Sequence, residues 1–583
     1  MPNFIRLHNK PYHWLINEAH QKFVQANFIG KEQVLEEEAL KSPLKDNNAR
    51  TLFSVSLPGQ TELFIKRYKI DSLPRMLRNL VSSKAVNELR ISNYLITKNC
   101  PTVYPIAVVQ KKKWGMPIDT FLIMKKLPDM PTLGGYIENL NSRNEINEIV
   151  FLSGNLIRNI HSINLFHRDL HMGNILIHAG VEPKQLYIID LHRASVLPGL
   201  SREQQIFNLA QFSYSMLGLL PSTNIMRFLK VYSSLDSRKI KLKALAYIVY
   251  ERLVNIRHKH WQARNKRCFR NSSRYMAVKD GRKTFYVNRS YSGMADKLID
   301  VLSGSELSGK VLKETAGHRL SVCNIVELAD NFYIKEYRNY SFLGKVKSLL
   351  GYCPAKNNWI AADGLTIRGV LTADPVAFMI EKESFYDWVN TARIITKGIK
   401  GIPSNQYVID NFSSSYAPAI NHRASKMNKN NELKGYVSSE PLWRQLFIRK
   451  KEFIKDFALA VRRLHHKGVF HCDLKANNVI VKETADSVNY NRENPTNPRF
   501  PNWEFYFIDL DRVKFRQVLP WRERIKNLAQ LNAAMPAVMT KSDRIRFFRY
   551  YAYGDVPVRT SREVRILAAI MRISIKRHHI WPG

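Results

Sequence analysis

One stretch of this 583-residue sequence occurs twice, and that repeat limits the folds the chain can adopt. Residues 161–174 read HSINLFHRDLHMGN, and residues 465–478 read HHKGVFHCDLKANN. Four polar residues keep a constant spacing of 304 positions: His161 with His465, His167 with His471, Asp169 with Asp473, and Asn174 with Asn478. A chain of this length is too long for one ordinary domain. The repeat therefore predicts two homologous domains in tandem.

Three further pairs of segments extend the repeat in both directions. Downstream, YIIDLHR at 187–193 matches YFIDLDR at 506–512, and the tetrapeptide Asn-Leu-Ala-Gln stands at 208–211 and 527–530. These two pairs lie 319 positions apart, so 15 extra residues fall between Lys482 and Phe505, where they predict a surface loop. Upstream, LFIKRYK at 63–69 matches FYIKEYR at 332–338.

The first motif has the spacing H-x-D-L-x-x-x-N, which is the catalytic-loop pattern of protein-kinase-like enzymes. Phosphoryl transfer needs mainly positioning and charge neutralisation from the protein. The pattern predicts that Asp169 orients the acceptor hydroxyl, and that Asn174 and Asp190 bind a metal ion, with Mg²⁺ suited to such oxygen ligands. Lys66, on an upstream strand, would steady the phosphates of ATP, and Glu88, on the next helix, would pair with it.

The second half assigns the same roles to Asp473, Asn478, Asp509 and Lys335. It differs from the first half at two positions, because Asn358 stands opposite Glu88 and Cys472 replaces Arg168. The missing glutamate would leave Lys335 without its usual partner. The second half is therefore either an active enzyme, a weak one, or a scaffold that binds substrate.

Together the motifs predict an α+β fold made of two tandem protein-kinase-like domains, 1–260 and 270–583. Each would have a β-rich N-lobe, at about 1–127 and 270–398, and a mainly helical C-lobe, at about 128–260 and 399–583. No glycine-rich loop precedes Lys66, so the turn at 57–60 is the candidate cover for the nucleotide. Only 18 positions separate Asp190 from Asn208, and such a short activation segment favours a small or glycan acceptor over a docked peptide.

The net charge of +41 indicates an anionic partner, which could be nucleic acid, a phosphorylated glycolipid or a membrane surface. Residues 255–293 are especially basic and carry interleaved aromatic residues. This segment is either a solvated helix that leads into the next domain or a dock for an anionic surface. The five cysteines form no C-x-x-C pair, which favours a reducing compartment, and no apolar run has the length of a membrane span.

The run Ile188-Ile189-Asp190-Leu191-His192-Arg193-Ala194, with LFIKRYK upstream and the Asn-Leu-Ala helix downstream, resembles the lipopolysaccharide kinase family. That family includes the inner-core heptose kinases and the Kdo kinases. The resemblance covers nearly the whole chain, once per half. It implies transfer of the γ-phosphate of ATP to a sugar hydroxyl of the lipid A–core glycolipid.

By this resemblance Asp169 and Asp473 are the catalytic bases, and Asp190 and Asp509 are metal ligands. The expected location is the cytoplasm, peripheral on the anionic cytoplasmic face of the inner membrane, and no nucleic-acid partner is expected. Three alternatives stay open: a protein kinase, a small-molecule phosphotransferase, and a non-enzymatic module that keeps the fold.

Overall fold

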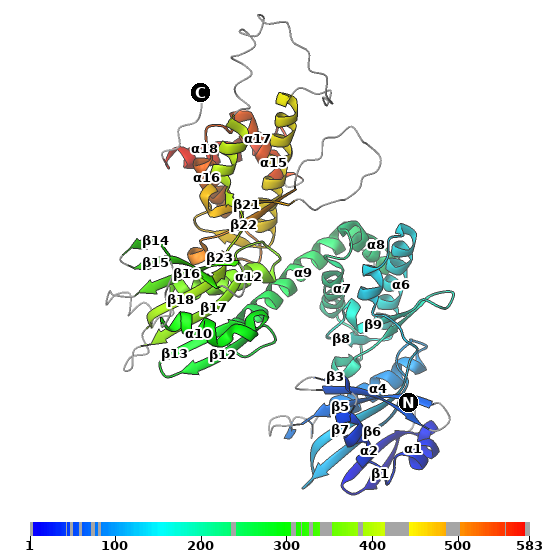
Figure 1. The fold of residues 1–583 in the computed structure, drawn as a ribbon. Coiled ribbons are helices and arrows are strands. Elements are labelled where there is room, and N and C mark those ends of the chain that lie inside the picture. Colours follow the sequence, from blue (N-terminus) through cyan, green and yellow to red (C-terminus); the bar gives the residue numbers. More distant parts are fainter. Residues whose placement is uncertain are drawn as a thin grey trace, which may run out of the picture. The chain divides into compact units, whose positions relative to one another are not determined.

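The computed structural model divides the chain into two compact units, Met1–Arg257 and His258–Gly583, called here the first and second unit (Figure 1). Helix α9 (Leu242–Asn265) contains the boundary. The structure describes residues 4–41, 43–46, 50–57, 61–70, 76–77, 79, 83–234, 241–304, 310–315, 317–325, 330–338, 353–382, 389–413, 442–484, 502–553 and 556–577. The predicted turn at 57–60 and the predicted surface loop between Lys482 and Phe505 lie largely outside these residues.

Each unit begins with an antiparallel sheet of seven strands, and the two sheets have the same strand order. In the first unit the order is β1 (Phe4–Asn9), β2 (Tyr12–Asn17), β6 (Pro105–Lys113), β7 (Met116–Lys125), β5 (Thr61–Lys69), β4 (Arg50–Leu57) and β3 (Pro43–Asp46). In the second it is β12 (Tyr275–Asp280), β13 (Lys283–Asn288), β17 (Pro375–Lys382), β18 (Val389–Lys397), β16 (Asp330–Arg338), β15 (His318–Ile325) and β14 (Lys310–Thr315).

A mainly helical lobe follows each sheet. The first unit has α1 (Gln21–Asn27), α2 (Gln33–Lys41) and α4 (Lys84–Thr97) with its sheet, then α5 (Leu133–Glu138), α6 (Arg143–Ser162), α7 (Arg202–Met216) and α8 (Ser222–Ser233). The second has α10 (Ala295–Ser303) and α12 (Pro354–Ile367) with its sheet, then α13 (Ser404–Phe412), α15 (Leu442–His466), α16 (Trp521–Ala534), α17 (Lys541–Ala552) and α18 (Ser561–Ile575).

Short strands hold the loops that carry the sequence motifs. They are β8 (Leu165–His167), β9 (Ile175–His178), β10 (Gln185–Ile188) and β11 (Ala194–Val196) in the first unit, and β19 (Ile402–Pro403), β20 (Val469–His471), β21 (Val479–Thr484), β22 (Asn502–Phe507) and β23 (Val513–Phe515) in the second. The predicted fold class is confirmed, because each unit joins a β lobe to a helical lobe in the arrangement of a kinase.

The apolar periodicity of the sequence explains the helix that leads into each motif. In α6 the side chains of Ile149, Ile157 and Ile160 recur on one face and are buried. The Ser142 hydroxyl accepts a hydrogen bond from the Glu145 amide and so caps the start of this helix. The helix begins at Arg143, six residues before Ile149, because the cap and a polar first turn precede the apolar stripe.

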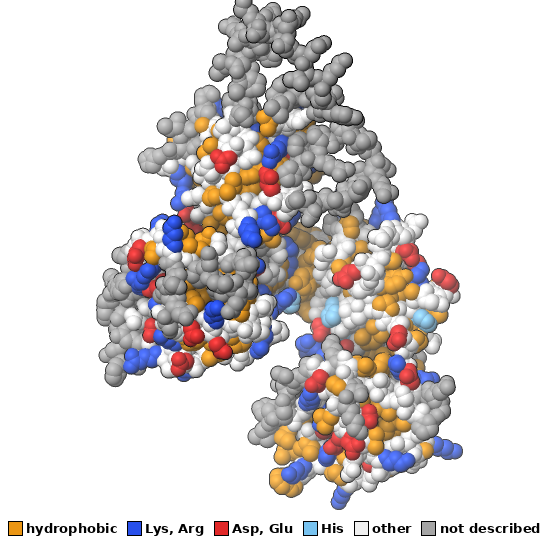
Figure 2. Space-filling model, in the orientation of Figure 1, with side chains coloured by type: hydrophobic (Ala, Val, Ile, Leu, Met, Phe, Trp, Pro, Cys, Tyr) orange, Lys and Arg blue, Asp and Glu red, His pale blue; other side chains and the backbone are white. Residues whose placement is uncertain are grey.

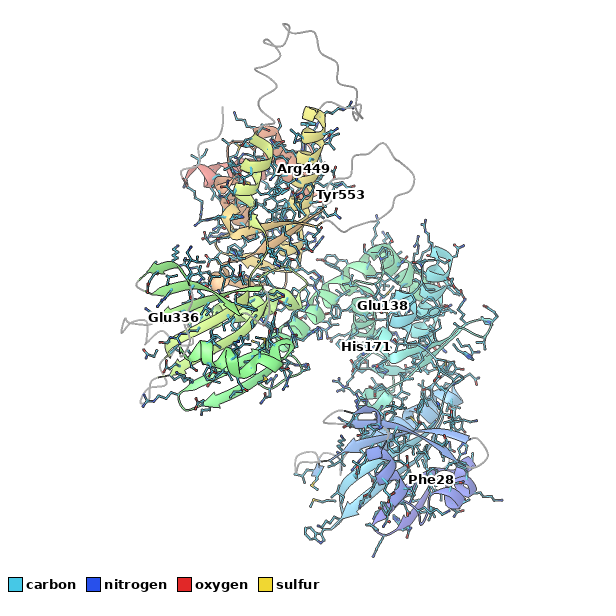
Figure 3. All side chains as sticks on the ribbon, viewed as in Figure 1. Phe28, Glu138, His171, Glu336, Arg449 and Tyr553 are labelled. Carbon is cyan, nitrogen blue, oxygen red and sulfur yellow. The ribbon has the colours of Figure 1, made fainter. Side chains whose placement is uncertain are left out.

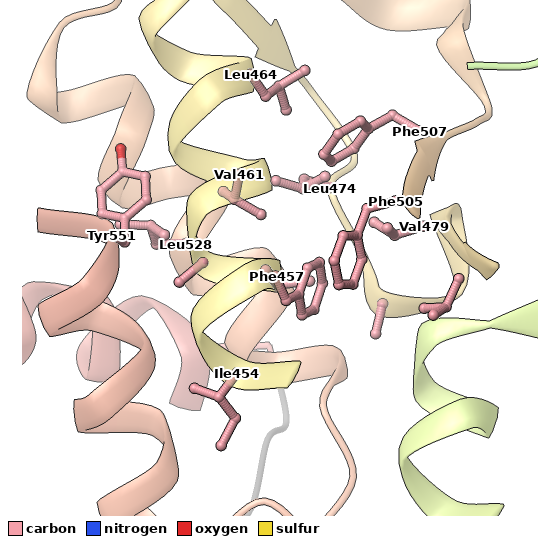
Figure 4. Packing of buried hydrophobic residues seen from close by; sticks show 14 of the residues in the cluster. Ile454, Phe457, Val461, Leu464, Leu474, Val479, Phe505, Phe507, Leu528 and Tyr551 are labelled. Carbon is pink, nitrogen blue, oxygen red and sulfur yellow. The ribbon is translucent and has the colours of Figure 1, made fainter. Parts of the chain in front are cut away.

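In the second unit, α15 packs its corresponding face against α17 and the β21–β22 hairpin (Figure 4). Phe457 of α15 stacks on Phe505 of β22 with ring centroids 4.8 Å apart. Val461 and Leu464 lie on the same face of the helix and are fully buried. This packing fixes the end of α15, and therefore the loop that follows it.

The basic segment 255–293 consists of the end of α9 and the β12–β13 hairpin. Its aromatic residues Trp261, Tyr275 and Phe285 are buried. They form part of the core, which supports the interpretation as a helix leading into the next domain. On the face shown in Figure 2, Lys and Arg side chains are spread over both units and not gathered in one patch. A search of the described helices finds none that could span a lipid bilayer.

Candidate active site

Three distant segments of the first unit meet at the ammonium group of Lys66. Lys66 lies on β5, and its Nζ is 3.0 Å from Oε1 of Glu88 on α4 and 2.7 Å from Oδ1 of Asp190, which follows β10. The Lys66 and Glu88 side chains are 12% and 4% exposed, so this ion pair is shielded from water. The structure therefore brings together the lysine, glutamate and aspartate that the sequence predicted.

Two residues that the sequence reasoning missed complete this network. The Arg50 guanidinium lies 2.8 Å from Oδ1 of Asp190, and His192 Nδ1 lies 2.6 Å from the same oxygen. Burial alone would raise the pKa of the Asp190 carboxyl, but the hydrogen bond from His192 and the charge of Lys66 outweigh it and hold that pKa well below its usual range. Asp190 is therefore an anion at any physiological pH, as a metal ligand must be.

Asp190 also has an unusual backbone conformation. Its φ is +60°, in the left-handed region, and Asp509 in the second unit has the same φ. A non-glycine residue in this region is uncommon and costs conformational energy, although aspartate tolerates it better than most. The same strained residue at the same place in both units marks the site where each strand turns to present its carboxylate.

The catalytic-loop residues of the first unit lie beside this network. Asn174 donates from Nδ2 to the carbonyl oxygen of Asp169 at 2.9 Å, and its own carbonyl accepts from the amide of Ile189 at 3.0 Å. These bonds place the predicted base, Asp169, and the predicted metal ligands, Asn174 and Asp190, in one site. The carboxylate of Asp169 is 3.5 Å from the Arg193 guanidinium and 3.9 Å from His171 (labelled in Figure 3).

Buried polar residues hold the catalytic loop in place, and this explains the repeated Asn-Leu-Ala-Gln tetrapeptide. Asn208 donates to the carbonyl of His167 at 2.5 Å, and its Oδ1 lies 3.3 Å from His161 Nε2. Gln211 donates to the carbonyl of Arg168 at 3.0 Å and accepts from the Leu170 amide at 3.2 Å. Burial lowers the pKa of His161 and of His167 to about 4, so both are neutral and structural.

The hydrogen bonds from the asparagine and the glutamine of the tetrapeptide to the catalytic loop are called the clamp here. The second unit has the same clamp. Asn527 donates to the carbonyl of His471 at 2.5 Å, and its Oδ1 lies 3.1 Å from His465 Nε2. Asn478 donates to the carbonyl of Asp473 at 2.9 Å and accepts from the Ile508 amide at 3.0 Å. The sequence repeat is therefore also a repeat of the site.

The second unit differs at its strand lysine: Lys335 lacks the helix glutamate that is its usual partner, as the sequence predicted, but another carboxylate takes that place. Lys335 Nζ lies 2.8 Å from Oδ2 of Asp511 and 3.1 Å from Oδ1 of Asp509. Asn358, which stands where the first unit has Glu88, donates to Asp511 at 2.6 Å. The carboxylate that pairs with the lysine has thus moved from the helix to the position of His192.

This exchange is reflected in the electrostatics of the pair. Burial alone would lower the pKa of Lys335, but the charges of Asp511 and Asp509 outweigh it and raise that pKa. Burial would raise the pKa of Asp511, but Lys335 outweighs it and lowers that pKa. Lys335 and Asp511 are therefore both charged.

Two cavities of the second unit adjoin these residues. A cavity of about 710 Å³ between sheet and helical lobe is lined by Lys335, Asn358, Ile394, Asp509 and Asp511, among others. A second, of about 730 Å³, is lined by Asp473, Arg512 and again Asp511. The first has the size of a small-molecule pocket and contains Lys335 and the predicted metal ligand Asp509, whereas the second contains the predicted base.

The model of the lipopolysaccharide kinase (Kdo/WaaP) family matches residues 48–232 and 424–551, more than half of the chain. The chain belongs to this family. Both matched segments contain a catalytic loop, so the family assignment applies to both units and makes the chain a kinase that transfers phosphoryl groups. At the family level it is a lipopolysaccharide kinase, as the resemblance in the sequence implied.

Among solved structures, one titled "WaaP in complex with acyl carrier protein" is similar to this chain at 19% sequence identity. The similarity covers 49% of this chain and 95% of that one, with a TM-score of 0.33. No curated protein matches the chain significantly.

Proposed function

We propose that the chain transfers the γ-phosphoryl group of ATP to a sugar hydroxyl of the lipopolysaccharide inner core, a heptose or a Kdo, and that each unit has its own active site. The observation that carries this proposal is made in both units: the lysine on a strand of the sheet contacts the aspartate that follows β10 or β22. Lys66 meets Asp190 at 2.7 Å, and Lys335 meets Asp509 at 3.1 Å. Membership of the kinase family supports ATP as the phosphoryl donor.

The residues present fit Mg²⁺ and ATP. Asp190 and Asn174 in the first unit, and Asp509 and Asn478 in the second, offer carboxylate and amide oxygens, which are the ligands that Mg²⁺ prefers. The Nδ2 atoms of both asparagines donate to the catalytic loop, so their Oδ1 atoms are left for a cation. Bound Mg²⁺ would neutralise charge on the phosphates.

In this mechanism Asp169 and Asp473 orient the acceptor hydroxyl and accept its proton. The hydroxyl oxygen forms a bond to the γ-phosphorus while the bond from that phosphorus to the β,γ-bridging oxygen breaks. Lys66 and Lys335 hold the phosphates of the donor, and Glu88 and Asp511 hold the lysines. The short connection between β11 and α7, from Val196 to Arg202, leaves little chain on which a peptide could dock and therefore suits a glycan acceptor.

The acceptor and the location follow from charge in this proposal. A net charge of +41 favours encounter with an anionic lipid A–core glycolipid and with an anionic membrane face. We therefore place the enzyme in the cytoplasm, peripheral on the cytoplasmic side of the inner membrane. The experiment that tests the function uses the full chain, γ-labelled ATP, Mg²⁺, and lipid A–core from a strain that lacks core phosphate.

Label should enter the glycolipid, and Asp169→Asn/Asp473→Asn should lower the rate at least about 100-fold, because the general base is gone from both units. The exposed Asp129→Asn is the matched control. Equal rates for the double variant and the wild-type chain would contradict the proposal. Label found on serine, threonine or tyrosine of added protein, and not on sugar, would assign the chain to the protein kinases instead.

A further inference from the structure

The 730 Å³ cavity that contains the predicted base of the second unit is lined by an unusual number of cations. Asp473 lies in it next to Lys475, whose Nζ is 3.0 Å from the Asp473 carboxylate. The other four cations of the lining are Arg512, Lys514, Lys526 and Arg577. They come from the β23 region, from α16 and from the residues after α18, so separate elements bring positive charge to one place.

Nearby carboxylates are already paired and do not neutralise these cations. Asp511 pairs with Lys335, and Glu523 pairs with Arg516 at 2.8 Å. Within the part of the chain that the structure describes, Arg512, Lys514, Lys526 and Arg577 have no carboxylate partner. The four side chains are exposed to solvent, where an anion could reach them.

The first unit offers a direct comparison, because Arg512, Lys514 and Lys526 have counterparts there 319 positions earlier. Arg193 matches Arg512, and Arg168 stands where the cavity has Cys472. Ser195 and Phe207 stand where the second unit has Lys514 and Lys526. Phe207 packs on Phe166 with ring centroids 5.8 Å apart, and Lys526 lies over Phe470, the counterpart of Phe166, at 5.8 Å. The lysine therefore occupies the place of the phenylalanine.

We propose that this cavity binds a phosphate or carboxylate group of the acceptor, and that the second unit takes a more anionic acceptor than the first. The proposal rests on the proposed function, since it treats Asp473 as the base. In this proposal Lys514 and Lys526 of the cavity determine the specificity of the second unit for its acceptor. Clustered ammonium and guanidinium groups are the usual way to bind a sugar phosphate or a sugar acid.

This assignment gives the two units an order of action. Transfer of the γ-phosphoryl group of ATP to a core hydroxyl by the first unit, with ADP as the leaving group, adds negative charge to the core. The phosphorylated product then matches the cationic cavity better than the starting acceptor does. The second unit would then act on an acceptor that already carries phosphate. Long-range attraction also raises the rate at which such an acceptor arrives.

The test gives the second unit the residues of the first. The parent carries Asp169→Asn, so that only the second unit is active. The variant adds Lys514→Ser/Lys526→Phe to this parent. Both are assayed on lipid-free core oligosaccharide, once phosphorylated and once dephosphorylated. The ratio of kcat/KM for the two forms should fall about 10-fold or more, since hydrogen bonds to a charged group are lost. Lys279→Ser/Arg282→Ser removes two charges from the β12–β13 hairpin outside the cavity and is the control.

The reciprocal variant, Ser195→Lys/Phe207→Lys in an Asp473→Asn background, should raise the same ratio in the first unit. Unchanged ratios in both experiments would overturn the proposal. If no variant or parent transfers phosphate at all, the proposed function fails, and titration calorimetry of the full chain with the phosphorylated oligosaccharide decides the cavity separately. Equal affinity with and without Lys514→Ser/Lys526→Phe would then overturn it.

A membrane lipid is a second source of phosphate. Binding of the full chain to phosphatidylglycerol vesicles separates the two sources. If Lys514→Ser/Lys526→Phe weakens vesicle binding but leaves the oligosaccharide ratio unchanged, the cations serve lipid headgroups and the acceptor assignment is wrong. If the kcat/KM ratio falls and vesicle binding is unchanged, the cavity binds the anionic group of the sugar acceptor.

Discussion

Lys335 pairs with Asp511 at 2.8 Å, whereas its counterpart in the first unit, Lys66, pairs with Glu88 at 3.0 Å. The two carboxylates come from different elements: Glu88 from helix α4, and Asp511 from the turn after β22. Two substitutions, Glu88 to Asn358 and His192 to Asp511, account for the exchange. The second unit thus keeps a lysine held by a carboxylate, and the lack of the helix glutamate is no sign of a dead enzyme.

This exchange predicts a loss and a rescue. In an Asp169→Asn background, Asp511→Asn should lower kcat/KM of the second unit about 10- to 100-fold, because a charge-assisted bond to Lys335 is lost. A separate variant, Asn358→Glu/Asp511→His, gives the second unit the residues of the first and should retain most of the kcat/KM that Asp511→Asn loses. Steady-state kinetics with varied ATP measures both. Full activity of Asp511→Asn would contradict the assigned role.

Lys66 is the cation shared by Glu88 and Asp190, and its removal should inactivate the first unit. Lys66→Met in an Asp473→Asn background should lower turnover at least about 100-fold, because the charge that stabilises the transferred phosphoryl group is gone. Lys125→Met, on the exposed end of β7, is the matched control. A thermal melt of each variant separates lost activity from lost structure. Turnover within a few-fold of the parent would remove Lys66 from the site.

The clamp at Asn208 predicts an effect on stability and on catalysis together. Asn208→Ala leaves buried backbone and histidine groups without partners, which costs about 1–3 kcal/mol of unfolding free energy. The catalytic loop loses its support, so kcat should fall more than the affinity for ATP. Asn527→Ala should act in the same way on the second unit, and the exposed Asn139→Ala should do neither. Calorimetry and kinetics on the same samples check this.

The buried histidines predict how stability depends on pH. Burial lowers the pKa of His161 to about 4 and of His465 to about 3, whereas a histidine of the unfolded chain has a pKa of about 6.5. Below about pH 6.5 the unfolded chain binds protons that the native chain does not, so stability falls as the pH is lowered toward 4.

The thermal midpoint should therefore drop between pH 7 and pH 5, and it should drop less in His161→Gln/His465→Gln. Scanning calorimetry at several pH values measures this difference. His178→Gln, at a half-buried histidine, serves as the comparison. An equal drop in the double variant and the wild-type chain would mean that other groups govern the acid sensitivity.

The site residues that occur in both copies of the repeat could be predicted from the sequence. Asp169, Asn174 and Asp190 stand at motif spacing, and the structure brings them together with Lys66 and Glu88. The fold class followed from the same order of motifs. Whether these residues act as assigned stays a prediction until the variants are made.

What the sequence reasoning missed depends on contacts between segments that no short motif links. Arg50 reaches Asp190 across 140 positions, and nothing in its own strand marks it. Asp511 is different, because a signal was present: YFIDLDR carries an extra acid where YIIDLHR has His192. Comparing the two copies for paired gains and losses of charge would have found the new partner of Lys335.

The identical strand order of the two sheets has a consequence for the ancestry of the chain. Each sheet has a leading hairpin at its edge, β1–β2 in one and β12–β13 in the other, so the ancestral gene segment that was duplicated already included it. That hairpin shields β6 in the first sheet and β17 in the second by direct pairing. A shortened second half that starts after Asn288 would leave the edge of β17 unpaired and would tend to aggregate. One that starts at Tyr275 keeps the β12–β13 hairpin, which pairs with that edge.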